Sequence, residues 1–190
     1  MFLKEQLMPD FKILNLQTLN EKQLYNGVYL LILNARNVPP HLSLTVSGKV
    51  YGISTKGPTF DKDVNLYLNY IRKHNIESVF VQLKLPLVYT DEEMLSAVRE
   101  VIKAYPRVDV GIATCLSPIK DFMSSAYQTE VHDVHLIFDL LPKLKAQNII
   151  EGYYQMNLNE AIKNGELLMK RYSFFDVNEA IHKSRSKPVK

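Results

Sequence analysis

The chain has 190 residues, of which 46% are hydrophobic and 23% are charged, and it contains one cysteine. This composition is typical of one globular domain and excludes a disordered chain, a collagen, a coiled coil and a disulfide scaffold. The formal net charge is +3, but Lys183, Arg185, Lys187 and Lys190 are all positive, which leaves the rest of the chain close to neutral. A near-neutral body with a basic tail does not indicate a nucleic-acid-binding protein.

The sequence carries no targeting or cofactor signal. No run approaches the ~18 apolar residues of a membrane helix, and residues 1–10 lack a basic segment followed by an apolar one. A lone cysteine cannot form an intrachain disulfide, which suits a thiol-reducing compartment. The 7 glycines form no phosphate-binding loop. We therefore expect a cytoplasmic protein that acts on a small molecule or peptide, with no cofactor and no membrane or nucleic-acid partner.

A buried strand and a hairpin are predicted in the first third of the chain. Residues Val28–Asn34 form a continuous apolar run of strand length. His41–Val46 alternates apolar and polar residues, Ser47-Gly48 favours a two-residue turn, and Lys49–Thr55 follows as the returning strand. These segments predict an antiparallel part of a sheet.

A two-residue turn would fix the register of this hairpin. Val46 then lies opposite Lys49, and His41 lies beside Ser54 on the neighbouring strand. The alternation places the apolar side chains of the first strand on one face and His41 with small polar residues on the other. His41 is therefore expected to project from the face that carries no large apolar side chain.

Helices and strands alternate along the rest of the chain. Caps, helical spacing and apolar runs predict helices from Asp61 or Asp63 to 74 and at 90–105, 114–127 and 130–145, with a kink or end at Pro142, strands at 78–85 and 108–113, and two short capped helices from 157 and 176. A basic flexible tail is predicted at 182–190. Because no linker divides the chain, we predict one α+β domain over 1–190, with its core at about 25–175 and a partly antiparallel sheet packed with helices.

The only cysteine, Cys115, lies where a predicted strand meets a predicted helix. A thiol at a helix N-terminus is close to the positive end of the peptide dipoles, which lowers its pKa and favours the nucleophilic thiolate. The position therefore suits a catalytic nucleophile. A free cysteine is also one of the most frequently buried residues and behaves as a small apolar side chain. Both interpretations stay open at this point.

His41 is the candidate base for such a nucleophile. In the predicted register, the hydroxyl of Ser54 is placed to orient the imidazole ring, although less firmly than a carboxylate would. The alternative is a histidine on a solvated face of the sheet. Cys115 is far from His41 in the sequence, so contact between the two side chains is a hypothesis.

The order of these residues resembles a known family. A histidine opens a strand in Pro39–His41, a second strand follows, and a cysteine stands at a helix start in Ala113–Leu116. This arrangement is similar to the circularly permuted branch of the NlpC/P60 papain-like superfamily, in which the histidine precedes the cysteine. The resemblance covers about residues 28–127.

The resemblance implies a papain-like fold with a cysteine nucleophile. It assigns Cys115 as the nucleophile, His41 as the general base and Ser54 to the place of the family's third polar residue. An intracellular amidase, thioesterase or acyltransferase is the implied activity. A member of the fold that has lost its activity is the alternative that the same resemblance allows.

His132, His135 and Asp139 form a second candidate site. On a helix, positions i, i+3 and i+7 share one face, so two imidazoles and a carboxylate could bind Zn²⁺ or Fe²⁺. The pattern lacks a His-Glu-x-x-His arrangement and continues through apolar residues, which favours an amphipathic helix boundary without a metal. Pairing of either histidine with Cys115 is less favoured, because both follow it closely on a neighbouring helix.

The sequence thus leads to two main classes of function. The first is a cysteine-dependent hydrolase or acyltransferase that acts on an amide or (thio)ester through Cys115 and His41. The second is a non-enzymatic binding or scaffold protein on the same fold. A metal-dependent enzyme using His132, His135 and Asp139 is a third hypothesis. The substrate and the oligomeric state stay open.

Overall fold

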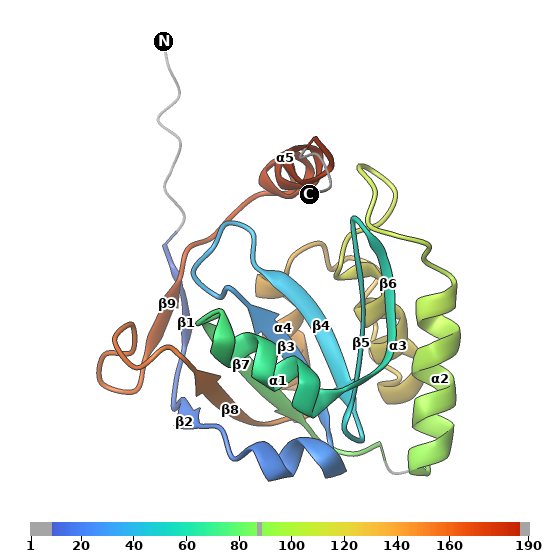
Figure 1. Cartoon of the computed structure of the whole chain (residues 1–190), viewed down its shortest axis with the longest axis horizontal. Coiled ribbons are helices and arrows are strands. Elements are labelled where there is room, and N and C mark those ends of the chain that lie inside the picture. Colours follow the sequence, from blue (N-terminus) through green and yellow to red (C-terminus); the bar gives the residue numbers. More distant parts are fainter. Residues whose placement is uncertain (1–8, 87–88, 187–190) are drawn as a thin grey trace.

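The computed structural model describes residues 9–86 and 89–186 of the chain. Its helices surround a mixed sheet (Figure 1). In chain order the elements are β1 (Phe11–Ile13), β2 (Gln17–Thr18), the 3-10 helix η1 (Glu21–Asn26), β3 (Val28–Leu33), β4 (His41–Val46), β5 (Lys49–Ser54), β6 (Gly57–Asp63), α1 (Val64–Lys73), β7 (Ser78–Leu83), α2 (Asp91–Lys103), α3 (Ser117–Tyr127), α4 (Ile137–Ala146), β8 (Ile150–Met156), β9 (Leu167–Met169) and α5 (Phe174–Arg185).

The main sheet has seven strands in the order β2-β8-β7-β3-β4-β5-β6, and β1 and β9 form a separate two-stranded sheet. Within the main sheet β2 and β8 run parallel, and the other neighbours run antiparallel. All residues of the central strand β3 are buried. A strand covered on both faces needs an uninterrupted apolar sequence, so the prediction from Val28–Asn34 is confirmed.

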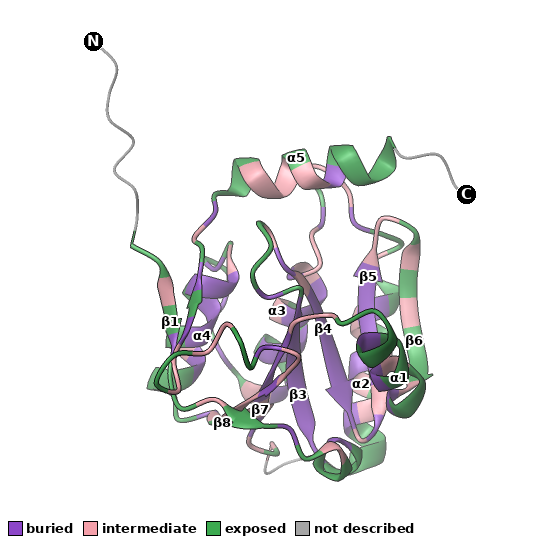
Figure 2. Cartoon of the chain, turned by 60° about the vertical axis from the view of Figure 1, so that its left-hand side comes forward, coloured by how far each residue is buried: buried purple, intermediate pink, exposed green. Residues whose placement is uncertain are grey.

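Helices cover both faces of the main sheet. On the face we call the α1 face, Leu68 and Ile71 of α1 pack onto Leu31 and Phe80. On the other face, called the α3 face, residues of α2, α3 and α4 join a larger cluster that contains Leu44 of β4. The last helix, α5, lies across one end of the strands (Figure 2). Alternate residues of each strand therefore enter different clusters, which decides where the candidate site residues point.

The register predicted for the hairpin is confirmed. Val46 pairs with Lys49 and Leu44 pairs with Tyr51, as a two-residue turn requires. Both turn residues adopt positive φ angles, 45° and 76°, as such turns need. The regular pairing ends at Leu44. His41, the first residue of β4, and Ser54, the last residue of β5, therefore lie beyond the paired positions.

The capping residues in the sequence mark the starts of two helices correctly. At the start of α1, the side chain of Asp63 accepts the N–H of Asn65 at 2.9 Å. At the start of α2, Thr90 and Glu93 form a reciprocal capping box. α3 starts at Ser117 and carries a proline in its first turn, as predicted.

The helix predicted from residue 130 is wrong at its start, because α4 begins only at Ile137. Residues 129–136 form an irregular loop before it. The ammonium group of Lys120 on α3 donates to the carbonyl oxygens of His132 (3.3 Å) and Val134 (2.6 Å), and these tertiary contacts hold the loop. Pro142 lies inside α4 and does not end it.

Three other predicted segments are corrected. Residues 108–113 form turns joined by one isolated bridge, because too few residues pair to make a strand. The segment from Asn157 is a turn that follows β8 and not a capped helix. α5 continues to Arg185, whose guanidinium pairs with Asp109 at 2.8 Å. The first residues of the basic tail predicted at 182–190 therefore belong to a helix, and its last four residues lie outside the described segments.

The predicted fold class is confirmed. The chain is an α+β protein that forms one domain, with a largely antiparallel sheet packed against helices. The papain-like detail of the prediction stays a prediction. In the described segments, every helix is too short or too polar to cross a membrane.

Candidate functional site

Cys115 lies in a turn directly before α3. The backbone at this helix start is held by neighbouring side chains. The N–H of Thr114 donates to Ser117 Oγ at 2.9 Å, and the N–H of Leu116 donates to Thr114 Oγ1 at 3.2 Å. The thiol is therefore near the helix start, as predicted, and the two hydroxyl groups bind amides of the turn that precedes the helix.

Burial dominates the acidity of the Cys115 thiol. It raises the pKa of the thiol from 9.0 to about 11, and the backbone N–H groups of Leu42, Cys115 and Leu116 lower it by less. A buried thiolate loses its hydration, which favours the protonated form. At neutral pH the sulfur is therefore a thiol and not the thiolate that attacks carbonyl groups.

His41 is the first residue of β4, and its side chain points to the α1 face. It pairs across the sheet with Leu33, a member of the cluster on that face. Its Nε2 lies 3.5 Å from the Oγ of Ser43, which is two residues along the same strand and shares its face. Burial lowers the pKa of the ring, so the imidazole is neutral at neutral pH.

The side chain of Cys115 approaches the sheet from the other side. It packs against the cluster on the α3 face, which also contains Leu42, the residue after His41 in β4. Successive residues of a strand point to opposite faces. His41 and Cys115 therefore meet β4 from different sides, and the hydrogen bonds of the described segments include none between them.

In the described segments, Ser54 forms no hydrogen bond with the imidazole of His41. Its hydroxyl donates to the carbonyl oxygen of Gly57 and accepts the N–H of Lys56, both at 3.2 Å, and these bonds close the turn between β5 and β6. The side-chain partner of His41 is Ser43 instead. The sequence contained the signal for Ser43, because residues two apart on a strand are neighbours on one face.

All three predicted catalytic residues nevertheless line one pocket, which we call the Cys115 pocket. It has a volume of about 260 Å³, and Cys115, His41 and Ser54 all contribute to its wall. Val177 and Ile181 of α5 also line it. The structure thus brings the predicted residues to the same end of the sheet without joining thiol and imidazole as a hydrogen-bonded pair.

The candidate metal site is not assembled. His132 and His135 are exposed in the loop before α4. Asp139 accepts the backbone N–H groups of Leu136 (3.0 Å) and His135 (3.3 Å) at the start of that helix. The three residues do not share a helical face, because the helix begins after both histidines. No group of three His, Cys, Asp or Glu side chains in residues 9–86 and 89–186 is arranged to hold a metal ion.

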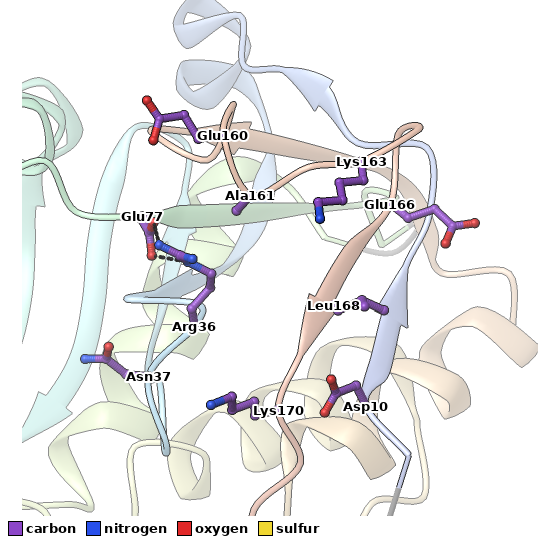
Figure 3. A pocket seen from close by; sticks show the side chains of 10 residues that line it. All are labelled: Asp10, Arg36, Asn37, Glu77, Glu160, Ala161, Lys163, Glu166, Leu168 and Lys170. Atoms are coloured by element: carbon purple, nitrogen blue, oxygen red, sulfur yellow. Dashed lines mark hydrogen bonds and ion pairs between the residues drawn. The ribbon is translucent and has the colours of Figure 1, made fainter.

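A larger cleft, which we call the β9 cleft, lies beside strand β9 (Figure 3). Its volume is about 710 Å³, which is within the usual range for ligand pockets. The loop after β3, the start of β7, the loop between β8 and β9, and β9 itself form its walls. Its lining residues are Asp10, Arg36, Asn37, Glu77, Glu160, Ala161, Lys163, Glu166, Leu168 and Lys170.

Cationic side chains face the middle of the β9 cleft. Arg36 stands on one wall and donates from Nε to Glu77 at 2.7 Å. Lys163 and Lys170 direct their ammonium groups toward the space in front of Arg36 (Figure 3), and neither has an ion-pair partner among the described residues. The carboxylate of Glu166 points away from the cleft (Figure 3). Although acidic side chains outnumber basic ones in the lining, the two lysines are therefore the charges that face its centre without an ion-pair partner in the described segments.

Two carboxylates stand at the rim of the β9 cleft. Asp10 lies near Lys170, and Glu160 points away from Lys163 (Figure 3). Their negative charge limits the positive field to the middle of the cleft. A negative rim also repels a long polyanion. The arrangement suits a ligand with a small number of negative charges.

Sequence reasoning missed the β9 cleft because its residues come from separate parts of the chain. Positions 10, 36–37, 77 and 160–170 meet only in the folded molecule. One local signal was available: Lys163 and Lys170 flank the short apolar run that forms β9. Two lysines around three apolar residues are too common in proteins to indicate a site without the fold.

The comparisons with known proteins gave no match. No protein-family model, no curated protein and no solved structure is similar to this chain. Interpretation of the two sites therefore depends on their geometry and chemistry.

Proposed function

We propose that this chain is a non-enzymatic binding protein whose ligand site is the β9 cleft. The observation that carries the proposal is that Lys163 and Lys170 face one cleft without an ion-pair partner in the described segments. Cations in a concave site concentrate their field and attract anions from solution. The ligand is therefore expected to carry one or two carboxylate or phosphate groups.

The lining of the β9 cleft supports binding and not catalysis. It includes no thiol, hydroxyl or imidazole side chain, and of its carboxylates Glu77 is paired with Arg36 and Glu166 points away from the cleft. Its lysines and arginine can hold and orient an anion. The state of the Cys115 pocket supports the same conclusion, because its thiol is protonated at neutral pH and the side-chain hydrogen bond of its histidine is to Ser43 and not to the thiol.

The test is a titration of the ¹⁵N-labelled chain with glutarate and with the capped peptide Ac-Val-Glu-Val-Glu-Val-NH₂. We expect saturable shifts of amides at 36–37 and 163–170. The double variant Lys163→Gln/Lys170→Gln should weaken binding at least ~10-fold, because charge-assisted contacts to the anion are lost.

The matched control is Lys56→Gln/Lys73→Gln, which removes the same charge from exposed positions that do not line the cleft. It should bind each probe within about two-fold of the parent chain, since distant exposed charges are largely screened by salt. Equal weakening in both double variants, or the absence of saturable shifts at the cleft with either probe, would overturn the proposal.

The cysteine hydrolase or acyltransferase predicted from the NlpC/P60 resemblance is the second candidate function. One observation favours it, namely that Cys115, His41 and Ser54 line the same pocket. It requires the imidazole to leave Ser43 and reach the sulfur. Hydrolysis of p-nitrophenyl acetate that is lost in Cys115→Ser and in His41→Ala would support it, whereas equal background rates in all three chains would count against it.

A further inference from the structure

We propose that the ligand of the β9 cleft is an extended acidic peptide, which adds as a strand to the free edge of β9 and directs its carboxylates toward Lys163 and Lys170. This inference rests on the proposed binding function and specifies the class of ligand. A strand edge, an exposed leucine and two lysines that flank the strand carry the argument.

The first observation is the free edge of β9. In the described part of the chain its one strand partner is β1, which pairs with it from Phe11–Met169 to Ile13–Leu167. In Figure 3, β1 lies on one side of β9 and the cleft lies on the other. Alternate residues of an antiparallel strand direct their N–H and C=O groups to opposite sides. Part of the β9 backbone therefore offers donors and acceptors to the cleft.

The edge strand β6 of the main sheet is protected, in contrast. Pro58 removes one N–H from it, and Asp61 bends it with a φ of 47°. The guanidinium of Arg99 on α2 holds Asp61 with bonds of 2.7 and 2.9 Å. Proline, bends and charges are the usual means by which proteins block strand addition. β9 contains no proline and borders a cleft, which makes its edge the more accessible of the two.

The second observation is the exposure of Leu168. Its neighbours Leu167 and Met169 are buried in the core, whereas Leu168 is 50% exposed and lines the cleft. A leucine beside a strand edge can pack against a side chain of an added strand. A small inorganic anion would leave this apolar surface uncovered, so Leu168 favours a peptide.

The third observation is the position of the lysines. Lys170 follows β9 directly, and Lys163 lies in the loop before it, so their ammonium groups flank the strand. Glutamate or aspartate side chains of an added strand would meet a cation toward each end. The negative rim at Asp10 and Glu160 disfavours a nucleic acid, whose charges are denser.

The experiment uses the full chain and isothermal titration with Ac-Val-Glu-Val-Glu-Val-NH₂. We expect saturable binding that falls at least ~10-fold in Lys163→Gln/Lys170→Gln and less than about two-fold in Lys56→Gln/Lys73→Gln. A peptide with glutamine in place of both glutamates should lose binding to a similar degree, because it keeps the backbone and removes the carboxylates.

Two N-methylated peptides separate strand addition from charge attraction. One carries N-methyl groups on its valines and the other on its glutamates. Because only one of these two sets of amides faces β9 in a paired strand, one form should lose at least ~10-fold in affinity and the other should bind within about three-fold of the parent peptide.

The outcomes distinguish this inference from the proposed function. Equal affinity of the parent peptide and its two methylated forms, or equal loss of affinity in both methylated forms, would overturn strand addition. The cleft would then remain an anion site. Binding of glutarate at the cleft without binding of any peptide would do the same. Failure of both glutarate and the peptide to bind at the cleft would overturn the inference and the proposed function together.

Discussion

Cys115 is the chain's only thiol, so its reaction with iodoacetamide can be measured without a competing site. Burial raises its pKa to about 11, and we therefore expect the alkylation rate of the native chain to rise with a midpoint above pH 10. The unfolded chain should show a midpoint near the ordinary value of 9.0. His41→Ala should leave the native profile unchanged, because the imidazole lies on the α1 face.

The opposite result has an equally definite meaning. A native midpoint below ~8.5 that moves upward in His41→Ala would show that the imidazole stabilises the thiolate. The hydrolase would then become the better proposal. His74→Ala is the matched control, because it removes an exposed imidazole that does not line the Cys115 pocket and should not affect the profile.

The residue scale also shows where sequence reasoning reached its limit. The alternation in β4 correctly placed His41 on the polar face of the hairpin. The position of Cys115 before a helix was correct as well. The face of the sheet that α3 covers depends on packing between distant segments, and no pattern near Cys115 encodes it. Local sequence patterns could therefore not show whether the thiol of Cys115 and the imidazole of His41 meet.

At the scale of elements, α5 forms one wall of the Cys115 pocket. The helix lies over the Cys115 pocket and buries one of its own residues, Ile181. Arg185 fastens its C-terminal end, with an ion pair to Asp109 at 2.8 Å and a hydrogen bond to the carbonyl oxygen of Val108 at 2.9 Å. Because α5 buries so little surface, loss of these two contacts of Arg185 should make the helix detach from the pocket more often.

We expect Arg185→Ala to raise the alkylation rate of Cys115 roughly two- to five-fold at pH 8, in line with the modest strength of partly exposed ion pairs. Lys183→Ala is the control, because Lys183 pairs only with Glu179 on the same helix (2.9 Å) in the described structure. It should leave the rate unchanged. Identical rates in the parent chain and both variants would show that reagent reaches the thiol without movement of α5.

Elements with strong local signals were predicted well, and elements that depend on distant partners were not. β3, the hairpin and the capped helices α1 and α2 follow from apolar runs, turn residues and caps. β6 and β8 were missed because both have many half-exposed or polar residues. β9 is only three residues long and owes its shape to β1, more than 150 positions earlier in the chain.

At the scale of the whole molecule, the pH range of greatest stability should depend on two partly buried groups, His41 and Cys115, and on several tyrosines. Burial lowers the pKa of His41 below 6.5. Below pH ~6.5 the unfolded chain then binds more protons than the folded chain, so the free energy of unfolding falls as pH falls. Burial raises the pKa of Cys115 from 9.0 to about 11. Above pH ~9 the folded chain binds more protons, so the free energy of unfolding falls as pH rises.

Urea unfolding between pH 5 and pH 10.5 should therefore give a plateau from about pH 6.5 to 9, with an alkaline loss of about 2 kcal/mol from Cys115 near pH 10.5. Burial also raises the pKa of Tyr172, and it raises the pKa of Tyr29 and of Tyr105 to about 12, so these phenols add to the alkaline loss. His41→Gln should flatten the acid limb and leave the alkaline limb. Cys115→Ala should leave the acid limb and reduce the alkaline limb by the contribution of the thiol, while the contribution of the tyrosines remains. The comparison uses the shape of each profile, because either variant can lower stability at every pH by altering the packing. If both limbs persist unchanged in both variants, other groups set the range, and the burial of thiol and imidazole does not control how the folded chain responds to pH.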